Sequence, residues 1–504
     1  MLSPVPINKS KNNQYPDHNY IKQNIKTKQQ LKNNSDQKEP WSNAFNFNKT
    51  LSTHVDPRTG SLMTSVKVGS MISNLGHGPD INLKIDYSSD STTNPDSLGI
   101  GWSWNLTHFS PRTNQLITSM KQNFYLQKSA DDQWEPLYHK LKDINIHKDK
   151  YNGLIITYVN GLREILNNQG YEIRLEQQDG NAVNFFYAPG THLLTDIADN
   201  QNHQIKIIYH ENYIIVISQN ATGKPVSVRI NNSNNQLSDI TLSVQNSISK
   251  FGIHMTYKGH LITELNYPTG LKKVFDYNCT NAMRIAVINK QLALSLCVVS
   301  VATIITDVTQ PPLITHYIYS EVNANDHNYL GFNTGLPSVI NHSKRDILFD
   351  APADYTYQTS EDNQLVTEIH TYNKYHLLIN DKKISDRTGH ILSEIENFYC
   401  RTDERNGCAY TSFKSLPATY NLPLKIVTKT WGDIDGDPDI NTVTSTYDKS
   451  GKPVCSTDDY GRITKITYCP VKGDNACPAM PEGWRFSTLP ESITVYPSRK
   501  INSL

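Results

Sequence analysis

Residues 447–468 read YDKSGKPVCSTDDYGRITKITY, and this stretch decides the fold class. A Tyr-Asp-x-x-Gly turn is followed by a second turn at Gly461 and then by an alternating strand that ends at Tyr468. In that strand Thr464 and Ile466 share a face with the closing tyrosine, because side chains alternate between faces with a period of two. A hairpin of this size cannot bury its own apolar face, so it must stack with further copies.

Looser copies of this unit recur upstream with a spacing of about twenty residues. Each copy has a turn glycine, a strand and a closing tyrosine, as repeated hairpins require. The copies run between these pairs of tyrosines: Tyr187 and Tyr209, Tyr257 and Tyr277, Tyr372 and Tyr399, and Tyr447 and Tyr468. Clean alternation at residues 81–87 adds a further strand. The sequence therefore predicts an all-β fold of antiparallel hairpin repeats.

The composition favours β-structure and argues against two classes of partner. The 504-residue chain carries 48 Lys and Arg and 48 Asp and Glu side chains, so it has no large basic field for nucleic acid or an anionic membrane. Hydrophobic residues make up 37%, and the 28 tyrosines outnumber the 13 phenylalanines. Tyrosine, threonine and isoleucine suit a half-wet pleated surface. We expect no nucleic-acid partner.

Three segments are predicted along the chain. Residues 1–48 are rich in Asn, Gln, Lys and Ser without apolar periodicity, which predicts a disordered polar leader. Residues 49–310 are predicted to form an N-terminal β-region. Residues 311–504 are predicted to form a second β-region, which begins near a stretch rich in Pro, Asn and Gly.

Neither a secretory signal nor a membrane span is predicted. The first forty residues lack the apolar region of a signal peptide. We therefore expect the protein to be secreted or displayed at the cell surface by a signal-less route, or otherwise to be cytoplasmic. Residues 292–305 are apolar but shorter than the ~18–20 residues of a spanning helix. Their Val, Ile and Thr content favours a buried strand pair.

The seven cysteines predict neither a disulfide framework nor a zinc site. Their number is odd, they are widely spread, and the sequence contains no CxxC pair. We interpret them as scattered thiols. A loop bridge between Cys400 and Cys408 is left open as an alternative.

No residue is predicted to be catalytic, to bind a cofactor or to bind a metal. The sequence lacks a nucleophile elbow, a zinc-type H-E-x-x-H and a phosphate-binding loop. The strongest metal candidate is DIDGDPD, from Asp433 to Asp439, where the glycine comes too early for a calcium loop and a proline intrudes. An exposed turn between strands is the favoured interpretation, and calcium binding is left open.

Two residue pairs near the N-terminal end admit both a structural and a functional interpretation. Trp102 and Trp104 alternate with Ser103, so both rings lie on one face of a strand. Core anchoring is favoured, and a sugar-stacking platform is the alternative. Arg58 is expected to pair with Asp56 or to cap a turn rather than to act in catalysis.

Several short motifs follow one another along the chain. They are VDPRTG at residues 55–60, GHGP at 76–79, GIGWSWNLT at 99–107, NYLGF at 328–332, YTY at 355–357 and CPAMP at 477–481. Together with the repeats, these motifs resemble those of the Rhs/YD-repeat proteins. This family includes the C component of insecticidal toxin complexes and the shells of bacterial polymorphic toxins. The resemblance spans roughly residues 50–500.

The resemblance implies that the repeats form part of a large hollow β-shell, which encloses a variable C-terminal toxin domain. The family's autocleavage end carries an Asp-Pro-x-Gly-Leu-type motif that this sequence lacks, and a full-length relative would continue well beyond Leu504. We therefore expect a non-enzymatic, encapsulating segment of such a shell, truncated and without its toxin domain.

The expected partners are a toxin-complex chain, or the missing C-terminal part of the shell and its cargo, which would pair with exposed strand edges. The alternative function is a surface or secreted module that binds carbohydrate or a host through exposed Trp and Tyr side chains. A carbohydrate-active enzyme with paired carboxylates is the least favoured function. No cofactor is expected.

Overall fold

Antiparallel strands make up nearly all the regular structure in the computed structural model, and no α-helix occurs among the described residues. The structure describes residues 51–498, without 130–132, 150, 152, 202, 220–222, 224, 245–250, 281–283, 286–293, 296, 308, 320–346 and 433–435. These residues fall within one unit, Leu51–Leu504. The all-β prediction is confirmed. The predicted leader at residues 1–48 and the NYLGF motif lie outside the described residues.

Four strands near the N-terminus form a separate antiparallel sheet, here called the N-terminal sheet. They pair in the order β1 (Leu51–Val55), β2 (Leu62–Met71), β3 (Ile81–Ser88) and β4 (Trp102–Trp104). Ile81, Leu83, Ile85 and Tyr87 are buried, and the residues between them are more exposed. The alternation predicted from the sequence is therefore confirmed.

The remaining strands form one antiparallel ladder, here called the long sheet, in which each strand pairs with the next one in the sheet. Its first strands are β5 (His108–Ser110), β6 (Gln115–Ile117), β7 (Asn123–Lys128), β8 (Gln133–Pro136), β9 (Ile144–Lys148), β10 (Leu154–Tyr158), β11 (Leu162–Leu166), β12 (Glu172–Gln177), β13 (Ala182–Tyr187), β14 (Leu194–Asp199), β15 (Gln204–Tyr209), β16 (Tyr213–Gln219), β17 (Pro225–Ser233), β18 (Gln236–Val244), β19 (Phe251–Lys258), β20 (Leu261–Asn266) and β21 (Lys272–Asn278).

The long sheet continues without a break in pairing after a small side pair, β22 (Arg284–Ile285) with β23 (Leu294–Ser295). Its later strands are β24 (Val298–Ile305), β25 (Leu313–Tyr319), β26 (Thr356–Asp362), β27 (Val366–Asn373), β28 (Leu378–Ser385), β29 (Ile391–Phe398), β30 (Lys425–Thr430), β31 (Asp439–Tyr447), β32 (Pro453–Thr457), β33 (Ile463–Tyr468) and β34 (Pro490–Tyr496). The ladder crosses the predicted boundary after residue 310, since β24 pairs with β25 and β25 with β26. The division there stays a prediction.

Six of the repeat tyrosines share a feature of strand pairing. Register shifts directly precede Tyr187, Tyr257, Tyr277, Tyr372, Tyr447 and Tyr468. Such a bulge bends the strand and re-aims the next side chain. The hydroxyl then donates to a main-chain carbonyl near the start of the preceding strand, as from Tyr277 to Ile262 (2.8 Å) and from Tyr468 to Pro453 (3.2 Å). Where this bond forms, the tyrosine fastens its strand to the preceding one. Tyr209 is an exception, since it has no register shift before it and its hydroxyl has no hydrogen-bond partner among the described residues.

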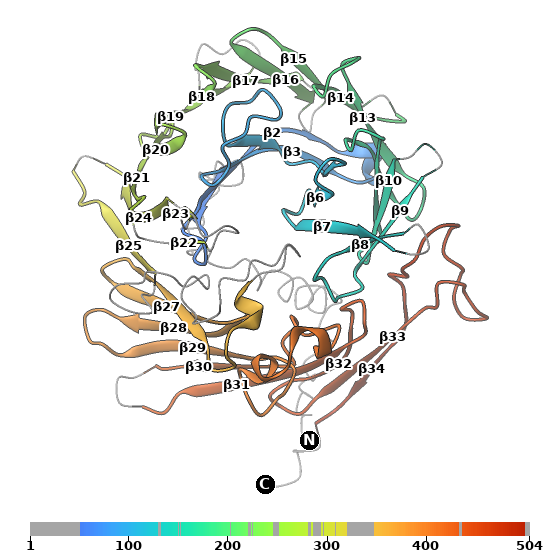
Figure 1. Ribbon diagram of the computed structural model, residues 1–504, viewed down its shortest axis with the longest axis vertical. Helices are drawn as coiled ribbons and strands as arrows, with labels where there is room; N and C mark the ends of the chain where they lie inside the picture. The colour runs from blue at the N-terminus through green and yellow to red at the C-terminus, as the bar shows by residue number, and fades with distance from the viewer. Residues whose placement is uncertain are drawn as a thin grey trace, which may run out of the picture. The chain divides into compact units, whose positions relative to one another are not determined.

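The long sheet curves back on itself, so that strands near its beginning meet loops near its end (Figure 1). The main-chain N–H of Lys142 donates to the carbonyl of Lys449 at 2.9 Å. The guanidinium of Arg163, on β11, lies over the ring of Trp484 at 4.1 Å from its centroid. These contacts join segments that are some three hundred residues apart in the sequence.

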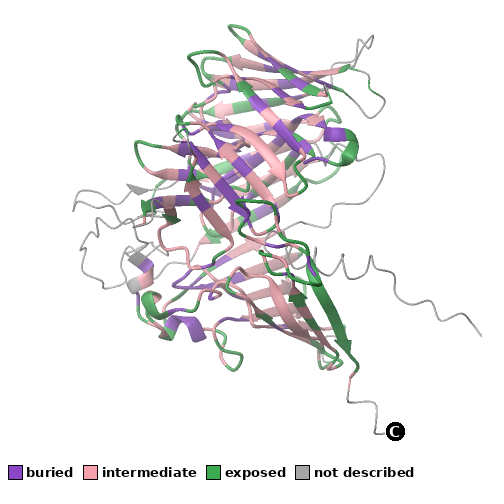
Figure 2. Ribbon diagram, turned by 90° about the vertical axis from the view of Figure 1, so that its right-hand side faces the viewer, coloured by how far each residue is buried: buried purple, intermediate pink, exposed green. Residues whose placement is uncertain are grey.

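The largest hydrophobic core lies between the N-terminal sheet and the strands β13–β24, here called the two-layer region. Its members include Tyr87 and Trp102 from the N-terminal sheet and Val183, Ile230 and Val299 from the long sheet. In the strands β28–β34, here called the single-layer region, most residues are half-buried or exposed (Figure 2). The described residues place no second sheet over these strands.

The tryptophan pair and the VDPRTG motif both serve the two-layer region. Trp102 is fully buried and Trp104 nearly so, and Trp102 Nε1 donates to the hydroxyl of Tyr257 at 3.0 Å. Core anchoring is confirmed, and these rings form no sugar-stacking surface. Asp56 accepts from the main-chain N–H of Arg58 at 2.7 Å and lies 3.5 Å from its guanidinium. The structural pairing predicted for these two residues is confirmed.

The turn at Gly60 docks the N-terminal sheet onto the long sheet. Its φ of +67° lies in the left-handed region, and a Cβ there would collide with Val298. Its carbonyl accepts from the N–H of Val299 at 2.8 Å. Val298 begins β24, so the apolar stretch at residues 292–305 supplies strands, as predicted. They do not form the predicted buried pair, since β23 pairs with β22 and β24 is half-buried after Val299. No helix in the described part of the chain is long and apolar enough to span a membrane.

The interpretation of the cysteines as scattered thiols is wrong. The structure pairs Cys279 with Cys297, Cys400 with Cys408, and Cys469 with Cys477, and leaves Cys455 as a free thiol. Each pair lies close in sequence, because its members flank a turn or a short excursion between strands. The fold brings them together, whereas spacing alone showed only an odd number of widely spread residues.

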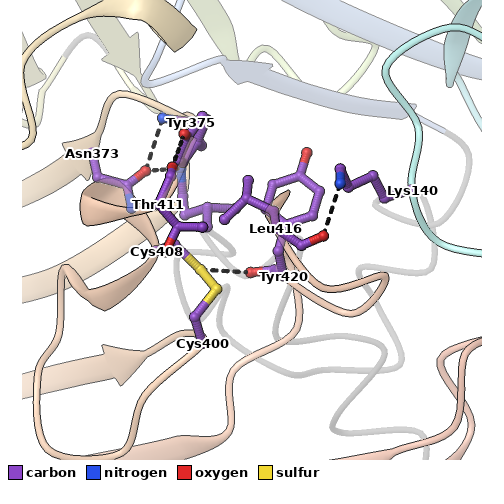
Figure 3. Close-up of a disulfide and its surroundings, with 9 residues drawn as sticks. Lys140, Asn373, Tyr375, Cys400, Cys408, Thr411, Leu416 and Tyr420 are labelled. Carbon is purple, nitrogen blue, oxygen red and sulfur yellow. Dashed lines mark hydrogen bonds between the residues drawn. A yellow bond between two sulfur atoms is a disulfide. The ribbon is translucent and has the colours of Figure 1, made fainter. Parts of the chain in front are cut away.

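The bridge between Cys400 and Cys408 holds a compact loop against the sheet (Figure 3). This loop carries the short helices η4 (Gly407–Tyr410) and η5 (Phe413–Ser415). Tyr375 donates from its hydroxyl to the carbonyl of Thr411 at 2.6 Å, and Lys140 donates to the carbonyl of Leu416 at 2.8 Å. The loop therefore links the end of the long sheet to its beginning.

Candidate functional site

Four ionisable side chains on three neighbouring strands form the strongest candidate for a site, here called the carboxylate–histidine cluster. They are Glu361 on β26, Glu368 and His370 on β27, and Asp381 on β28 (Figure 1 labels β27 and β28). Glu361 pairs directly with Glu368, and His370 with Asp381. Because Glu368 and His370 are two residues apart on one strand, all four side chains lie on one face of the sheet.

The imidazole of His370 lies between two carboxylates. The residue is 5% exposed, its Nδ1 lies 3.3 Å from Asp381 Oδ1, and its Nε2 lies 3.9 Å from Glu361 Oε1. Neither His370 Nε2 nor Glu361 Oε1 has a hydrogen-bond partner in the part of the chain that the structure describes. Buried polar atoms of this kind are uncommon and usually mark a missing partner or a functional role.

Several ionisable groups of the cluster lie close together and are largely buried, and both facts shift their pKa values. Burial raises the pKa of Glu361 to about 7, in spite of the nearby His370. Burial opposes the charged imidazole of His370, but the carboxylates of Asp381 and Glu361 outweigh this effect and raise its pKa. Lys383, opposite Glu368 on the next strand, lies 2.6 Å from its carboxylate. The cluster therefore carries more negative than positive charge whenever the imidazole is neutral.

The sequence contained a signal for this cluster that the motif search missed. Before several of the repeat tyrosines, the residue two positions earlier is apolar and buried, as at Phe185, Ile207, Met255 and Phe275. Before Tyr372, this position is occupied by His370. An ionisable residue at a core position of a repeat indicates a local function or a local compensation. The carboxylates that lie next to the imidazole, those of Glu361 and Asp381, come from the neighbouring strands. Only the pairing register of the strands identifies them.

A second buried acidic pair lies on the early strands of the long sheet. Glu164 on β11 and Glu172 on β12 are almost fully buried. Glu164 accepts from the hydroxyl of Tyr158 at 2.7 Å and from Ser119 at 2.8 Å, and Glu172 accepts from the main-chain N–H of Thr107 at 3.0 Å. Burial raises the pKa of both carboxyl groups, and the charge of Glu164 raises that of Glu172 further. Each carboxyl group of this pair therefore accepts at least one hydrogen bond, and we interpret the pair as structural.

The acidic stretch that the sequence offered as a calcium candidate lies at the connection between β30 and β31. Asp433 and Asp435 lie outside the described residues. Asp437 is exposed, and Asp439 begins β31 opposite Thr430. The stretch therefore leads into a strand, as the favoured interpretation has it. Calcium binding there stays a prediction.

Comparison with known proteins places the chain near no described family by sequence. No family model matches it. No curated protein matches it.

The solved structures that match this chain weakly include chains of Tc toxin assemblies. One is the Tc holotoxin pore of Photorhabdus luminescens with a mutant TccC3, at 9% identity and a TM-score of 0.30, covering 81% of this chain and 22% of that one. Another is the complex of TcdB2, TccC3 and Cdc42, at 10% identity and a TM-score of 0.29, covering 81% of this chain and 20% of that one. This chain thus spans about a fifth of the length of either. Likenesses of this strength assign the chain to no family.

Proposed function

We propose that this chain is a non-enzymatic wall segment of a toxin-related Rhs/YD-repeat protein, and that it helps to enclose another polypeptide. One observation carries the proposal. A single antiparallel ladder runs from β5 to β34, curves back to contact its own early strands, and is covered by a second described sheet over only part of its length. A wall built in this way is suited to surround a guest rather than to fill its own interior.

The exposure of β34, the last strand of the long sheet, favours a partner polypeptide that adds a further strand beside it. All residues of β34 are exposed, and its large apolar side chains Ile493, Val495 and Tyr496 are 42–50% exposed. Among the described strands, β34 pairs with β33 alone. An exposed edge with apolar side chains readily accepts a strand from another polypeptide. We propose that this partner is a toxin-complex chain or a further part of the shell.

The disulfides support a location outside the reducing cytosol. Three bridges close short loops in the chain, and disulfides persist mainly in oxidising compartments. We therefore propose that the protein is secreted or displayed at the cell surface, by the signal-less route expected from the sequence.

The two tryptophans that were the strongest candidates for binding carbohydrate are not available on the surface. Trp102 and Trp104 are buried, which leaves exposed tyrosines such as Tyr460 as the only basis of the carbohydrate-binding alternative from the sequence analysis. No other observation favours it.

The wall function is tested on the full-length chain, without a tag, purified under native conditions from its source cells. Native mass spectrometry is expected to show a complex of defined stoichiometry with a second polypeptide. Hydrogen exchange is expected to show that the amides of β34 are protected in the complex and exchange fast in the separated chain. The double variant Ile493→Lys with Val495→Pro is expected to lose the partner, because proline cannot donate to a ladder and lysine disfavours edge pairing.

The control is Tyr460→Lys, which changes an aromatic residue that is more exposed, at 74%, and lies on a hairpin turn. This variant is expected to keep the partner. A wild-type chain that is monomeric in its source cells, or a complex that survives the changes in β34 unaltered, would contradict the proposal.

A further inference from the structure

The carboxylate–histidine cluster has a charge arrangement that the sheet alone does not compensate. Glu361 and Glu368 are directly opposite each other on β26 and β27, and like charges in this position destabilise a sheet. Lys383 contacts Glu368 at 2.6 Å and is 42% exposed at its side chain, so it compensates this group from the edge of the cluster. Glu361 receives no hydrogen bond from it among the described residues.

A buried imidazole nitrogen provides an independent sign of a missing partner. His370 is more than nine-tenths buried, and its Nε2 is directed towards Glu361 Oε1 at 3.9 Å, which is too long for a hydrogen bond. A nitrogen and an oxygen therefore face each other across a gap, and neither has a hydrogen-bond partner in the described part of the chain. A cation between them would be a partner for both.

We propose that Glu368, His370 and Asp381 bind a divalent transition-metal cation, with Glu361 completing the site. One ligand atom from each of the first three residues lies within 4.8 Å of the others. Ligand atoms around a tetrahedral Zn²⁺ lie about 3.4 Å apart, given metal–ligand distances of about 2.1 Å. Small rotations of the three side chains close this difference, and Lys383 can swing into solvent as the cation takes its place beside Glu368.

The donor set selects the class of metal. One imidazole with two or three carboxylates suits Zn²⁺ or Mn²⁺, whereas Ca²⁺ and Mg²⁺ prefer oxygen ligands alone. No thiol is part of the cluster, so soft ions gain no preference. The ligands come from three consecutive strands, and the bound cation therefore fastens β26, β27 and β28 together at the border of the single-layer region.

The test measures metal uptake by the full-length chain without a histidine tag. The protein is treated with EDTA, exchanged into buffer at pH 7.5, and titrated with ZnCl₂ by isothermal titration calorimetry, with MnCl₂, MgCl₂ and CaCl₂ in parallel. About one equivalent of Zn²⁺ per chain is expected to bind, and the Mg²⁺ and Ca²⁺ titrations are expected to be much weaker. Substitution with Co²⁺ is expected to give visible bands of a nitrogen–oxygen site without a thiolate charge-transfer band, which separates this site from Cys455.

Two variants and one control locate the site. His370→Leu places an apolar residue where other repeats have one, and Asp381→Asn removes a charged ligand with little change in volume. Both are expected to weaken Zn²⁺ binding about tenfold or more and to lose the rise in melting temperature that Zn²⁺ gives the wild type. His254→Leu, at an exposed histidine of β19, is the matched control and is expected to bind as the wild type does.

The proposal is overturned if the wild type takes up no Zn²⁺ or Mn²⁺, which would make the cluster an internal ion network. It is also overturned if His370→Leu and Asp381→Asn bind as tightly as the wild type. Circular dichroism of each variant shows whether it is folded. If His370→Leu does not fold, Asp381→Asn and the Co²⁺ spectrum of the wild type decide the question.

Discussion

The two-layer region and the single-layer region are built from the same hairpin unit but are stabilised differently. In the two-layer region, the residues before the closing tyrosines are apolar and pack against the N-terminal sheet, as Met255 and Phe275 do. In the single-layer region, charged pairs such as Lys429 with Glu394 and Glu396 join neighbouring strands, and two disulfides fix the loops. The same backbone pattern is therefore compatible with a buried apolar core on its face, or with a solvent-accessible face that is stabilised by ion pairs and disulfides.

The difference shows what the repeat itself requires. The turn, the bulge and the tyrosine hydroxyl bond occur in both regions, at Tyr257 and Tyr277 as at Tyr447 and Tyr468. The nature of the side chains on the face of the sheet is free to vary, because a ladder of main-chain hydrogen bonds does not depend on it.

The largest effect is expected at the core of the two-layer region. Trp102→Ala removes a fully buried ring that contacts Tyr87 and Tyr257. We expect a loss of about 3–5 kcal/mol in the free energy of unfolding, measured by urea denaturation. Tyr460→Ala, at an exposed ring, is the control and is expected to change the stability by less than about 0.5 kcal/mol. A loss below about 1 kcal/mol for Trp102→Ala would mean that the two regions do not differ in their dependence on a core.

The next largest effect is expected in the single-layer region on removal of a disulfide. Replacing both Cys469 and Cys477 with serine opens a short loop and is expected to cost about 2–3 kcal/mol. Hydrogen exchange should show lost protection in β33, with little change in the N-terminal sheet. Cys455→Ser, at the free thiol, is the control. Equal loss of protection in both regions would show that they unfold as one unit.

A pH-dependent effect is expected from the buried acidic pair. Burial and the charge of Glu164 raise the pKa of Glu172 well above its ordinary value of 4.5, so the folded state favours the protonated form. The unfolded chain releases this proton near pH 4.5, and the stability that the protonated group contributes is lost as the pH rises from there towards the folded-state pKa. Glu172→Gln is therefore expected to melt at a higher temperature than the wild type at pH 7 and at a similar one at pH 4.

The measurement for this pair is the melting temperature between pH 4 and pH 8. Glu211→Gln removes one exposed negative charge and controls for net charge. The groups that surround the pair are hydroxyls and a main-chain N–H, from Tyr158, Ser119 and Thr107. Parallel pH profiles for the wild type and Glu172→Gln would contradict the prediction.

The smallest effect compares one tyrosine hydroxyl from each region. Tyr257→Phe removes a group that donates to the carbonyl of Leu237 and accepts from Trp102, and it leaves the indole N–H buried without a partner. We expect a cost of about 1–3 kcal/mol. Tyr468→Phe removes one hydrogen bond to a more accessible carbonyl and is expected to cost about 0.5–1 kcal/mol. Urea denaturation of both variants gives the comparison, and equal costs would mean that burial adds nothing to the hydroxyl bond.

The repeats could be predicted from the sequence because the residues that define each repeat lie close together along the chain. Turn glycines, alternating strands and closing tyrosines lie within about twenty residues of one another, and the structure confirms each of the four repeats chosen. The role of Trp102 and Trp104 also followed from alternation. The bulge before each tyrosine and its hydroxyl bond were not predicted, since both depend on the register of the neighbouring strand.

The carboxylate–histidine cluster and two of the disulfides were missed for a shared reason, whereas the structure contains the bridge between Cys400 and Cys408 that the sequence analysis left open. Asp381 and His370 become neighbours only when β27 and β28 pair in one particular register, which includes a bulge at Tyr372. Cys279 and Cys297 meet only because β21 pairs with β24 across a side excursion. A one-residue slip in either pairing would place these side chains on opposite faces.

The bulges that precede many of the repeat tyrosines have a consequence for how such proteins change in evolution. Each bulge adds its own bend to the sheet, so a hairpin that carries one brings its own curvature. Duplication or deletion of one hairpin unit would then lengthen or shorten the sheet by a fixed step and leave the bend of every other unit unchanged. The number of hairpin units in a gene, rather than any single mutation, would set the length of the sheet.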